Sequence, residues 1–217
     1  MVRTLFRMTK PARSDPPQGP PDNPSGVATD ADLLRAYRSG DAGAFRELVE
    51  RHQGQLLRHA SMLLRHGGGA AEDAVQEALL TLARTPPDPD NDIALELGIG
   101  AWLHRVTRNQ CLDNMRADTR RRDREETRAQ EEGATPMGSR VDPALEAVDA
   151  TDTQALIERT LIDLPEDQRE AVTLRLLHDK TYAEIAAITG RKVGTVGWLI
   201  SRGMKSLAAQ LSPILEA

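Results

Sequence analysis

Residues 164–211 read LPEDQREAVTLRLLHDKTYAEIAAITGRKVGTVGWLISRGMKSLAAQL, and this stretch decides the fold of the C-terminal part of the chain. Its apolar spacing predicts a helix that stops at residues 179–180 and a short helix over residues 182–189. A turn at Gly190 then leads into a last helix from about Val193. Two short helices joined by a glycine turn are typical of a helix-turn-helix, whose second helix lies in the major groove of DNA. The stretch therefore predicts a DNA-binding unit.

The last helix has two faces of different character. One narrow sector, expected to be buried, holds Val196, Ile200, Gly203, Leu207 and Leu211. The opposite sector, expected to face DNA, holds Thr195, Trp198, Ser201, Arg202 and Lys205. Gly203 is expected to let the neighbouring helix approach closely, and Leu199 is expected to pack. Trp198 has two interpretations. In the first it contacts DNA or a protein, and in the second it packs against the preceding helix.

Composition limits the class of protein. The 217 residues suffice for two small domains, and the low aromatic content of 3% favours an all-helical fold. The net charge is −5, although a protein that binds duplex DNA by itself usually has a basic surplus. Residues 168–211 nevertheless carry seven Lys and Arg against three acids. The charge is thus partitioned, and the acidic remainder indicates a protein partner.

Several kinds of chemistry are not indicated. The single cysteine, Cys111, excludes an internal disulfide and a cysteine-based zinc site, and we expect it to be a small buried residue. His52, His59 and His66 recur every seven residues. Seven residues advance a helix by about 10.5 Å, too far for one metal ion to bridge. We find no nucleophile–base pair, phosphate loop or metal cluster, so neither an enzyme nor a cofactor is predicted.

The sequence also predicts the location of the protein. It has no apolar run of the length that spans a membrane, and no apolar segment of the kind that a signal peptide needs. A cytoplasmic protein is therefore expected.

The chain is expected to be all-α, with two small helical domains joined by a flexible linker. Residues 1–29 are rich in Pro, Gly, Ser and Asp and are expected to be disordered. The first domain is predicted over 30–124, the linker over 125–150 and the helix-turn-helix domain over 151–217.

The first domain is expected to hold several helices. The first begins near Asp30, with Thr29 or Asp30 as its cap, and a long amphipathic helix follows up to a break at 66–69. A third helix is predicted from about Ala70 to Arg84, and a fourth from about Ile99 through three arginines at 120–122.

The third helix, AAEDAVQEALLTLAR, carries a compact polar patch. Val75, Ala78, Leu79 and Leu82 form its apolar stripe, and Asp73, Gln76 and Glu77 share the other side. An acidic and amide patch on a rigid helix suits pairing with arginines of a protein partner. The alternative is an ordinary solvated face.

The fourth helix reads AWLHRVTRNQCLDNMRADTRRR and is strongly basic. Such a helix, with Asn and Trp among its residues, suits contact with a phosphate backbone and unstacked bases. The alternative is a charged helix with local salt links to its aspartates. Trp102 is either a core residue or a stacking platform.

Four motifs occur in order along the chain: DLLRAYRSGDAGAFRELVERH, AEDAVQEALLTLAR, WLHRVTRNQCLDNMR and LPEDQREAVTLRLLHDKTYAEIAAITGRKVGTV. Together they resemble the extracytoplasmic-function (ECF) class of bacterial RNA polymerase sigma factors. That class joins two helical domains, regions two and four, by a flexible linker. The resemblance covers about Asp30 to Leu211, apart from the linker and the loop before Trp102.

The resemblance implies roles for particular residues. It implies docking of core RNA polymerase by Asp73, Gln76 and Glu77. It implies contact with the minus-ten promoter element by Trp102, Arg105, Arg108, Asn109 and Arg116. It implies contact with the minus-thirty-five element by Lys192, Thr195, Trp198, Ser201, Arg202 and Lys205. The implied partners are core RNA polymerase, promoter DNA and an anti-sigma factor.

The chain departs from the family pattern in two places. The loop PPDPDNDIALELGIG before Trp102 is long and acidic, and residues 197–199 are Gly-Trp-Leu where the family usually has a basic, Ser-containing run. Two alternatives to the sigma factor interpretation remain at this point. One is a helix-turn-helix regulator that binds DNA alone, and the other is an interaction protein that sequesters polymerase or an anti-sigma factor.

Overall fold

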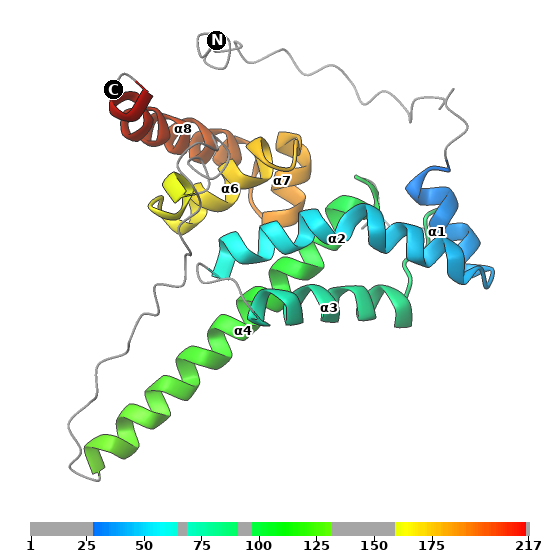
Figure 1. Ribbon diagram of the computed structural model, residues 1–217, viewed down its shortest axis with the longest axis horizontal. Coiled ribbons are helices and arrows are strands. Elements are labelled where there is room, and N and C mark those ends of the chain that lie inside the picture. The colour runs from blue at the N-terminus through cyan, green and yellow to red at the C-terminus, as the bar shows by residue number, and fades with distance from the viewer. Residues whose placement is uncertain (1–27, 65–68, 91–96, 132–158, 216–217) are drawn as a thin grey trace.

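The computed structural model describes residues 28–64, 69–90, 97–131 and 159–215. Within these ranges every regular element longer than one turn is a helix (Figure 1), which confirms the all-α prediction: α1 Asp30–Arg38, α2 Ala42–Leu64, α3 Gly69–Arg84, α4 Gly98–Glu131, α6 Glu166–Leu176, α7 Tyr182–Thr189 and α8 Val193–Leu215. The predicted disordered stretch up to residue 27 and most of the predicted linker lie outside the described residues.

Helices α1 to α4 form the first bundle around an aliphatic core. Helix α1 begins where the sequence predicts because the Thr29 hydroxyl accepts a hydrogen bond from the Asp32 N–H at 3.2 Å, and the Asp32 carboxylate accepts one from the Thr29 N–H. Asp30 then ties α1 to α2 by contacts with Arg51 at 2.9 Å and His52 at 2.7 Å. The core includes Leu34, Leu48, Leu56, Leu63, Val75, Leu82 and Leu103.

Helices α6, α7 and α8 form the predicted helix-turn-helix domain. Thr181 caps α7 through a reciprocal pair of hydrogen bonds with Glu184, and Gly190 ends α7 in the left-handed conformation with φ of 69°. On α8 the sector predicted to be buried is indeed covered, with Val196, Ile200 and Leu207 at most 5% exposed. Leu199 is buried too, as expected.

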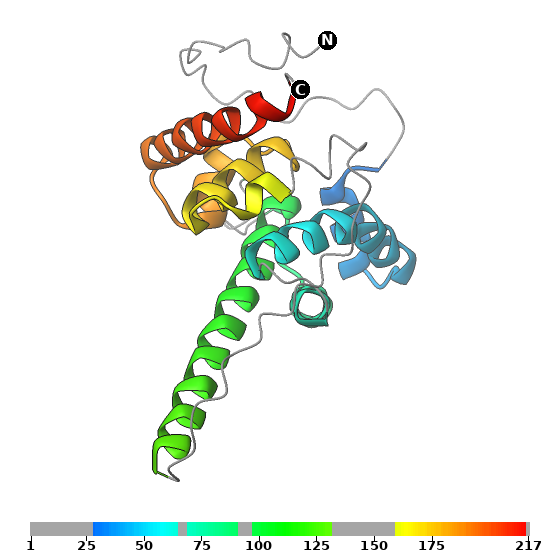
Figure 2. The same cartoon turned by 60° about the vertical axis from the view of Figure 1, so that its left-hand side comes forward.

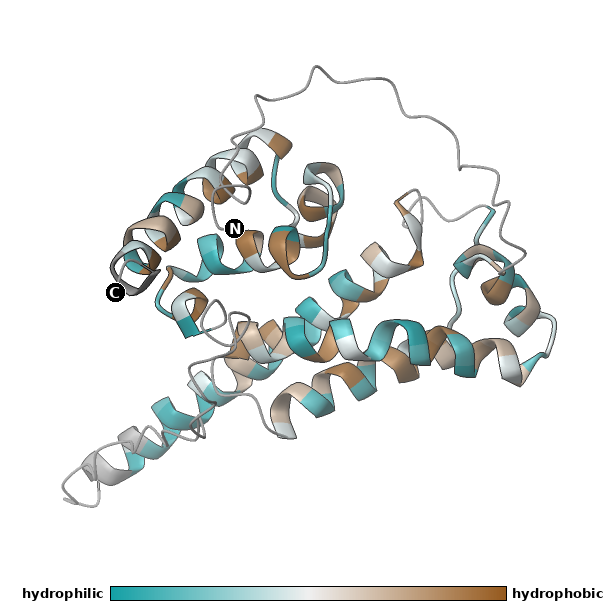
Figure 3. Cartoon of the chain, turned by 45° about the horizontal axis from the view of Figure 1, so that its top comes forward, coloured by the Kyte–Doolittle hydropathy of each residue, from teal (hydrophilic) through white to brown (hydrophobic). Residues whose placement is uncertain are grey.

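Helix α4 is longer than the sequence analysis expects. It continues to Glu131 and so occupies the first residues of the stretch 125–150 that we predicted to be linker. Arg120 and Arg124 donate to backbone carbonyls one turn back, and Arg121 lies 3.6 Å from Glu125. Such contacts between residues four apart stabilise a solvated helix, and a polar composition alone does not reveal them. The second half of α4 projects from the molecule and is hydrophilic (Figures 2 and 3).

The two helical domains lie against each other. Helix α4 contacts α7, and α2 contacts α6. Ala101 of α4 belongs to an apolar cluster with Leu174 and Ile185, and Met62 of α2 belongs to another with Val172 and Leu207. The domains therefore share buried surface, a contact that the expectation of two helical domains joined by a flexible linker does not specify. Among the described residues, no helix is long and apolar enough to cross a membrane.

Candidate functional site

The polar patch of α3 faces outward, as the sequence predicts. Asp73 and Gln76 are exposed, and Glu77 is partly exposed with one carboxylate oxygen 3.4 Å from Arg84 Nη1. The patch borders a depression of about 310 Å³ between α3 and α4, which is also lined by Gln110 and Asn114. Sequence reasoning missed these two amides, although their spacing of four residues places them on one face of α4.

An apolar groove of about 630 Å³ runs beside this patch, between α2 and α3. Its lining includes Phe45, Val49, Leu57, Leu79 and Leu80, and Gln76 lies at its edge. Leu57 and Leu80 are both more than a third exposed. An apolar groove next to an acidic and amide patch is the composition expected where another protein docks.

The predicted minus-ten residues of α4 do not share one environment. Asn109 is exposed, and so is Arg116, which pairs with Asp113 at 2.9 Å, while Arg105 is half-buried. Trp102 is buried in the core of the first bundle, so the core interpretation of this residue holds and its assignment to DNA contact is wrong for this structure. The apolar periodicity of the helix places Trp102 beside Leu103 and Val106 on the packed side, which explains the burial.

Arg108 of α4 is held by the other domain. Its Nε donates to Glu170 Oε1 of α6 at 2.6 Å, and the Glu170 side chain is only 3% exposed. Sequence reasoning gave Arg108 a role on DNA and did not identify Glu170, because the two residues are 62 positions apart.

The outer face of α8 is open to solvent. All six predicted minus-thirty-five residues are exposed: Lys192, Thr195, Trp198, Ser201, Arg202 and Lys205. Trp198 is 57% exposed, and the guanidinium of Arg202 lies 5.6 Å from its ring centroid. The interpretation in which Trp198 packs against the preceding helix is therefore wrong. Stacking of Arg202 on the indole orients both side chains on the exposed face.

Comparison with known proteins agrees with this arrangement. Residues 48–121 match the family described as Sigma-70 region 2, and residues 154–207 match Sigma-70, region 4. The chain is 32% identical over 183 residues to the ECF RNA polymerase sigma factor SigM of Mycobacterium tuberculosis, covering 84% of this chain and 85% of that protein. It is also 32% identical over 196 residues to the ECF RNA polymerase sigma-E factor of Escherichia coli, covering 87% and 97% of the two chains.

The chain belongs to the ECF RNA polymerase sigma factors. Such a factor directs core RNA polymerase to promoters. Residues 48–121 within the α1–α4 bundle match its region two, and residues 154–207, which include the helix-turn-helix, match its region four, and we use these names for the two domains.

Two solved structures share the fold of this sigma factor. One is CnrH in complex with the cytosolic domain of CnrY, with a TM-score of 0.55, 22% identity, and coverage of 85% of this chain and 97% of that chain. The other is the sigma factor RpoE in complex with the anti-sigma factor NepR from Bartonella quintana, with a TM-score of 0.52, 26% identity, and coverage of 77% and 96%.

A cluster of buried histidines lies where regions two and four of the sigma factor meet. His59 comes from α2, His104 from α4, and His178 follows α6. Sequence reasoning grouped His59 with His52 and His66 by spacing, whereas its neighbours come from other elements. His52 pairs with Asp30, and His66 lies outside the described residues. Among the described residues, no group of His, Cys, Asp and Glu has an arrangement that could hold a metal ion.

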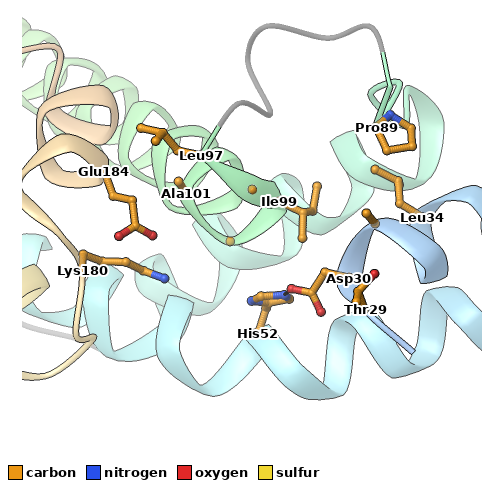
Figure 4. Close-up of a pocket in the computed structure, with 13 residues that line it drawn as sticks. Thr29, Asp30, Leu34, His52, Pro89, Leu97, Ile99, Ala101, Lys180 and Glu184 are labelled. Carbon is orange, nitrogen blue, oxygen red and sulfur yellow. Dashed lines mark hydrogen bonds and ion pairs between the residues drawn. The ribbon is translucent and has the colours of Figure 1, made fainter. Parts of the chain in front are cut away.

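A cavity of about 390 Å³ opens along the same boundary (Figure 4). The first turn of α4 and the Asp30–His52 pair line it from region two, and Lys180 and Glu184 line it from region four. A β-carbon at Gly100 would lie 3.3 Å from His52 Cε1 and 3.5 Å from Lys180 Nζ. Such a β-carbon would be crowded only by His52 of region two, because 3.5 Å from Lys180 of region four is an ordinary contact.

Burial sets the ionisation of the groups at this boundary. Burial raises the pKa of the Cys111 thiol to about 12, so the expectation of a small buried cysteine is confirmed. Burial alone would also raise the pKa of Glu170, but the neighbouring His59 and Arg108 outweigh it and lower that pKa. Glu170 is therefore an anion at neutral pH.

Proposed function

We propose that this sigma factor binds core polymerase through α3 and its surroundings and reads a split promoter through α4 and α8. The observation that carries the proposal is that the acidic and amide patch of α3 and the basic face of α8 are both exposed, on different domains. The two domains contact one polymerase–promoter complex, so weak individual contacts gain from a high effective concentration. This explains how a chain with a net charge of −5 functions on DNA.

The docking surface that we propose consists of Asp73, Gln76 and Glu77, with the apolar groove between α2 and α3 beside them. The carboxylates supply bidentate acceptors for arginines of the polymerase, and the groove accepts apolar side chains. Gln110 and Asn114 extend the surface onto α4.

The double variant Asp73→Arg with Glu77→Arg tests this docking surface. We expect it to lose pull-down of core polymerase, because it places like charges opposite the partner, and to keep its helix content by circular dichroism. The matched control is Glu50→Arg with Asp163→Arg, which makes the same charge change at two other exposed positions. Unchanged pull-down of the α3 variant would overturn the assignment.

For the minus-ten element we propose Arg105, Arg108, Asn109 and Arg116. For the minus-thirty-five element we propose the exposed face of α8: Lys192, Thr195, Trp198, Ser201, Arg202 and Lys205. Trp198 replaces a polar residue of the family pattern, and its exposed indole suits apolar contact with thymine methyl groups.

Replacement of Trp198 tests the reading of the upstream element. We expect Trp198→Ala to reduce run-off transcription from a cognate promoter, because it removes the apolar contact with thymine methyl groups. Core binding should not change, which separates DNA reading from docking. Gln210→Ala, exposed later on the same helix, serves as the control and should leave transcription unchanged. Equal transcription by the Trp198 variant and the wild type would contradict the proposal.

We further propose that an anti-sigma factor regulates the chain. CnrH and RpoE were both solved in complexes, with the cytosolic domain of CnrY and with the anti-sigma factor NepR. We also propose that the protein is not an enzyme and that it is located in the cytoplasm, where a polymerase subunit meets the chromosome. Run-off transcription with core enzyme distinguishes the sigma factor from a sequestering protein, which would produce no new start sites.

A further inference from the structure

Three histidines lie together, buried from solvent, at the contact between regions two and four. His59, His104 and His178 are at most 4% exposed. The ring centroids of His59 and His104 lie 4.9 Å apart, those of His104 and His178 lie 5.1 Å apart, and those of His59 and His178 lie 6.0 Å apart. Two of the rings belong to region two and the third belongs to region four, so the cluster exists only while the regions are in contact.

The hydrogen bond within the cluster requires one neutral ring. The Nδ1 atoms of His59 and His104 lie 3.1 Å apart, so one donates and the other accepts, and the accepting ring must be neutral. Both ring nitrogens of His178, and Nε2 of His59, have no hydrogen-bond partner among the described residues. A proton taken up by His178 would therefore create a buried charge without a hydrogen-bonded acceptor.

Cationic groups that face the cluster oppose the protonation of His104 and His178. Arg58 of α2 acts on His178, His52 of α2 acts on His104, and Lys180 before α7 acts on both. The carboxylate of Glu170 on α6 lies 3.8 Å from His59 Nε2 and pairs with Arg108 of α4 at 2.6 Å. Burial and then the neighbouring imidazoles lower the pKa of His104 well below its usual value.

His178 is the clearest case. Burial first, and then interactions with His59, Arg58 and Lys180, lower its pKa from 6.5 to about 3. The Cys111 thiol does not take part, since its pKa of about 12 keeps it neutral. Near neutral pH the closed arrangement thus holds His104 and His178 as neutral rings.

We propose that His104 and His178, packed against His59, form a pH-sensitive latch, which keeps region four on region two while these two rings are neutral and releases it when they take up protons. The proposal concerns an equilibrium of the free chain and goes beyond promoter recognition. Separation of the two regions also parts Arg108 from Glu170 and exposes the surface of α4 that α7 contacts. Opening would thereby free Arg108 for contact with the minus-ten element, and this effect rests on the role proposed above for Arg108.

The sign and size of the effect follow from the two states. In the open form a solvated histidine titrates near 6.5, whereas in the closed form its pKa is lower. The stabilisation of the closed form is therefore complete above about pH 6.5 and is lost as pH falls from 6.5 toward 3. Between pH 7.5 and 5.5 the ratio of open to closed molecules rises about tenfold per histidine, or about a hundredfold for His104 and His178 together.

Thiol labelling of the full chain measures this ratio even when open molecules are rare. Ala101 of α4 is 5% exposed and packs in the apolar cluster of region four, so a cysteine placed there reacts when the regions separate. We would introduce Ala101→Cys in a Cys111→Ala background and follow its reaction with dipyridyl disulfide at pH 7.5, 6.5 and 5.5. The reference is Gln53→Cys, at an exposed position, which corrects for the pH dependence of the thiol itself.

The labelling rate at position 101, divided by the reference rate, is expected to rise about a hundredfold from pH 7.5 to 5.5. The variant His104→Leu with His178→Leu should show no such rise, and His178→Leu alone should show about a tenfold rise. The control Gln210→Leu, at an exposed position of α8, should keep the full response. A constant ratio in the original chain, or the full rise in the double variant, would overturn the latch.

A second measurement does not depend on any histidine variant. The Cε1–H resonances of the histidines in the full chain should show His178 unprotonated at pH 5.5 in closed molecules. Protonation of His178 near pH 6.5 without faster labelling at position 101 would refute the proposal. Neither assay contains polymerase or DNA, so its failure and a failure of promoter recognition are distinguishable.

Discussion

At Gly203, α8 passes close to α6. A β-carbon there would lie 2.6 Å from Val172 Cγ2 and 3.5 Å from Gln168 Cβ. Val172 is fully buried and branched at Cβ, so it has little freedom to move away. The close approach that the sequence predicts for this glycine is confirmed, and it determines the distance between the two helices.

Replacement of Gly203 by alanine is therefore expected to destabilise region four. Overpacking costs about 1–3 kcal/mol. The better helix propensity of alanine offsets about 1 kcal/mol of this cost. We expect a lower free energy of unfolding in urea, and Gly194→Ala provides the comparison, because a β-carbon at Gly194 would meet nothing within 4 Å. Equal stability of the two variants would show that α6 can yield at this contact.

At the scale of elements, α7 depends on its N-terminal cap. The helix has only eight residues, Tyr182–Thr189, and the Thr181 hydroxyl accepts a hydrogen bond from the Glu184 N–H at 3.2 Å. The Glu184 carboxylate in turn accepts one from the Thr181 N–H at 2.7 Å. The spacing of Thr181 and Glu184 could have been identified from the sequence as a capping box, although our sequence analysis did not use it.

Thr181→Ala should lower the stability of region four by about 1 kcal/mol, since it removes the hydroxyl that caps α7. Thermal unfolding of the full chain measures the change. Thr181→Ser keeps a hydroxyl and should remain close to the wild type. If serine and alanine at this position lower the melting temperature equally, the capping bond does not stabilise α7.

At the scale of the whole molecule, regions two and four are in contact. Arg108 and Glu170 connect α4 with α6, and the Glu170 side chain is 3% exposed. Removing one partner of a buried ion pair costs about 3–5 kcal/mol, because the other charge remains buried alone.

Arg108→Ala should therefore favour the open arrangement at neutral pH. Expressed as a ratio of open to closed molecules, the loss of the pair corresponds to more than about a hundredfold. Thiol labelling of Ala101→Cys at pH 7.5 measures it, with Arg116→Ala, which removes an exposed arginine of the same helix, as the control. An unchanged labelling rate in the Arg108 variant would mean that the pair does not hold the regions together.

Local patterns were sufficient for most of the fold. The start of α1 at Thr29, the bounds of α7 and the turn at Gly190 follow from caps and glycine, which act within a few residues. The exposed face of α8 follows from helical periodicity, so Trp198 was placed correctly on the solvent side. Trp102 had two interpretations because periodicity alone does not distinguish a packed indole from one that faces a ligand.

By itself, the sequence determined the helices, their buried faces, the order of the two regions and the family to which the chain belongs. These properties depend on interactions between neighbours along the chain and on short motifs that occur in a fixed order. Only the tertiary structure brought Arg108 to Glu170 and His178 to His59 and His104. These contacts join residues far apart in the chain, and their chemistry arises from burial, which no local pattern reports.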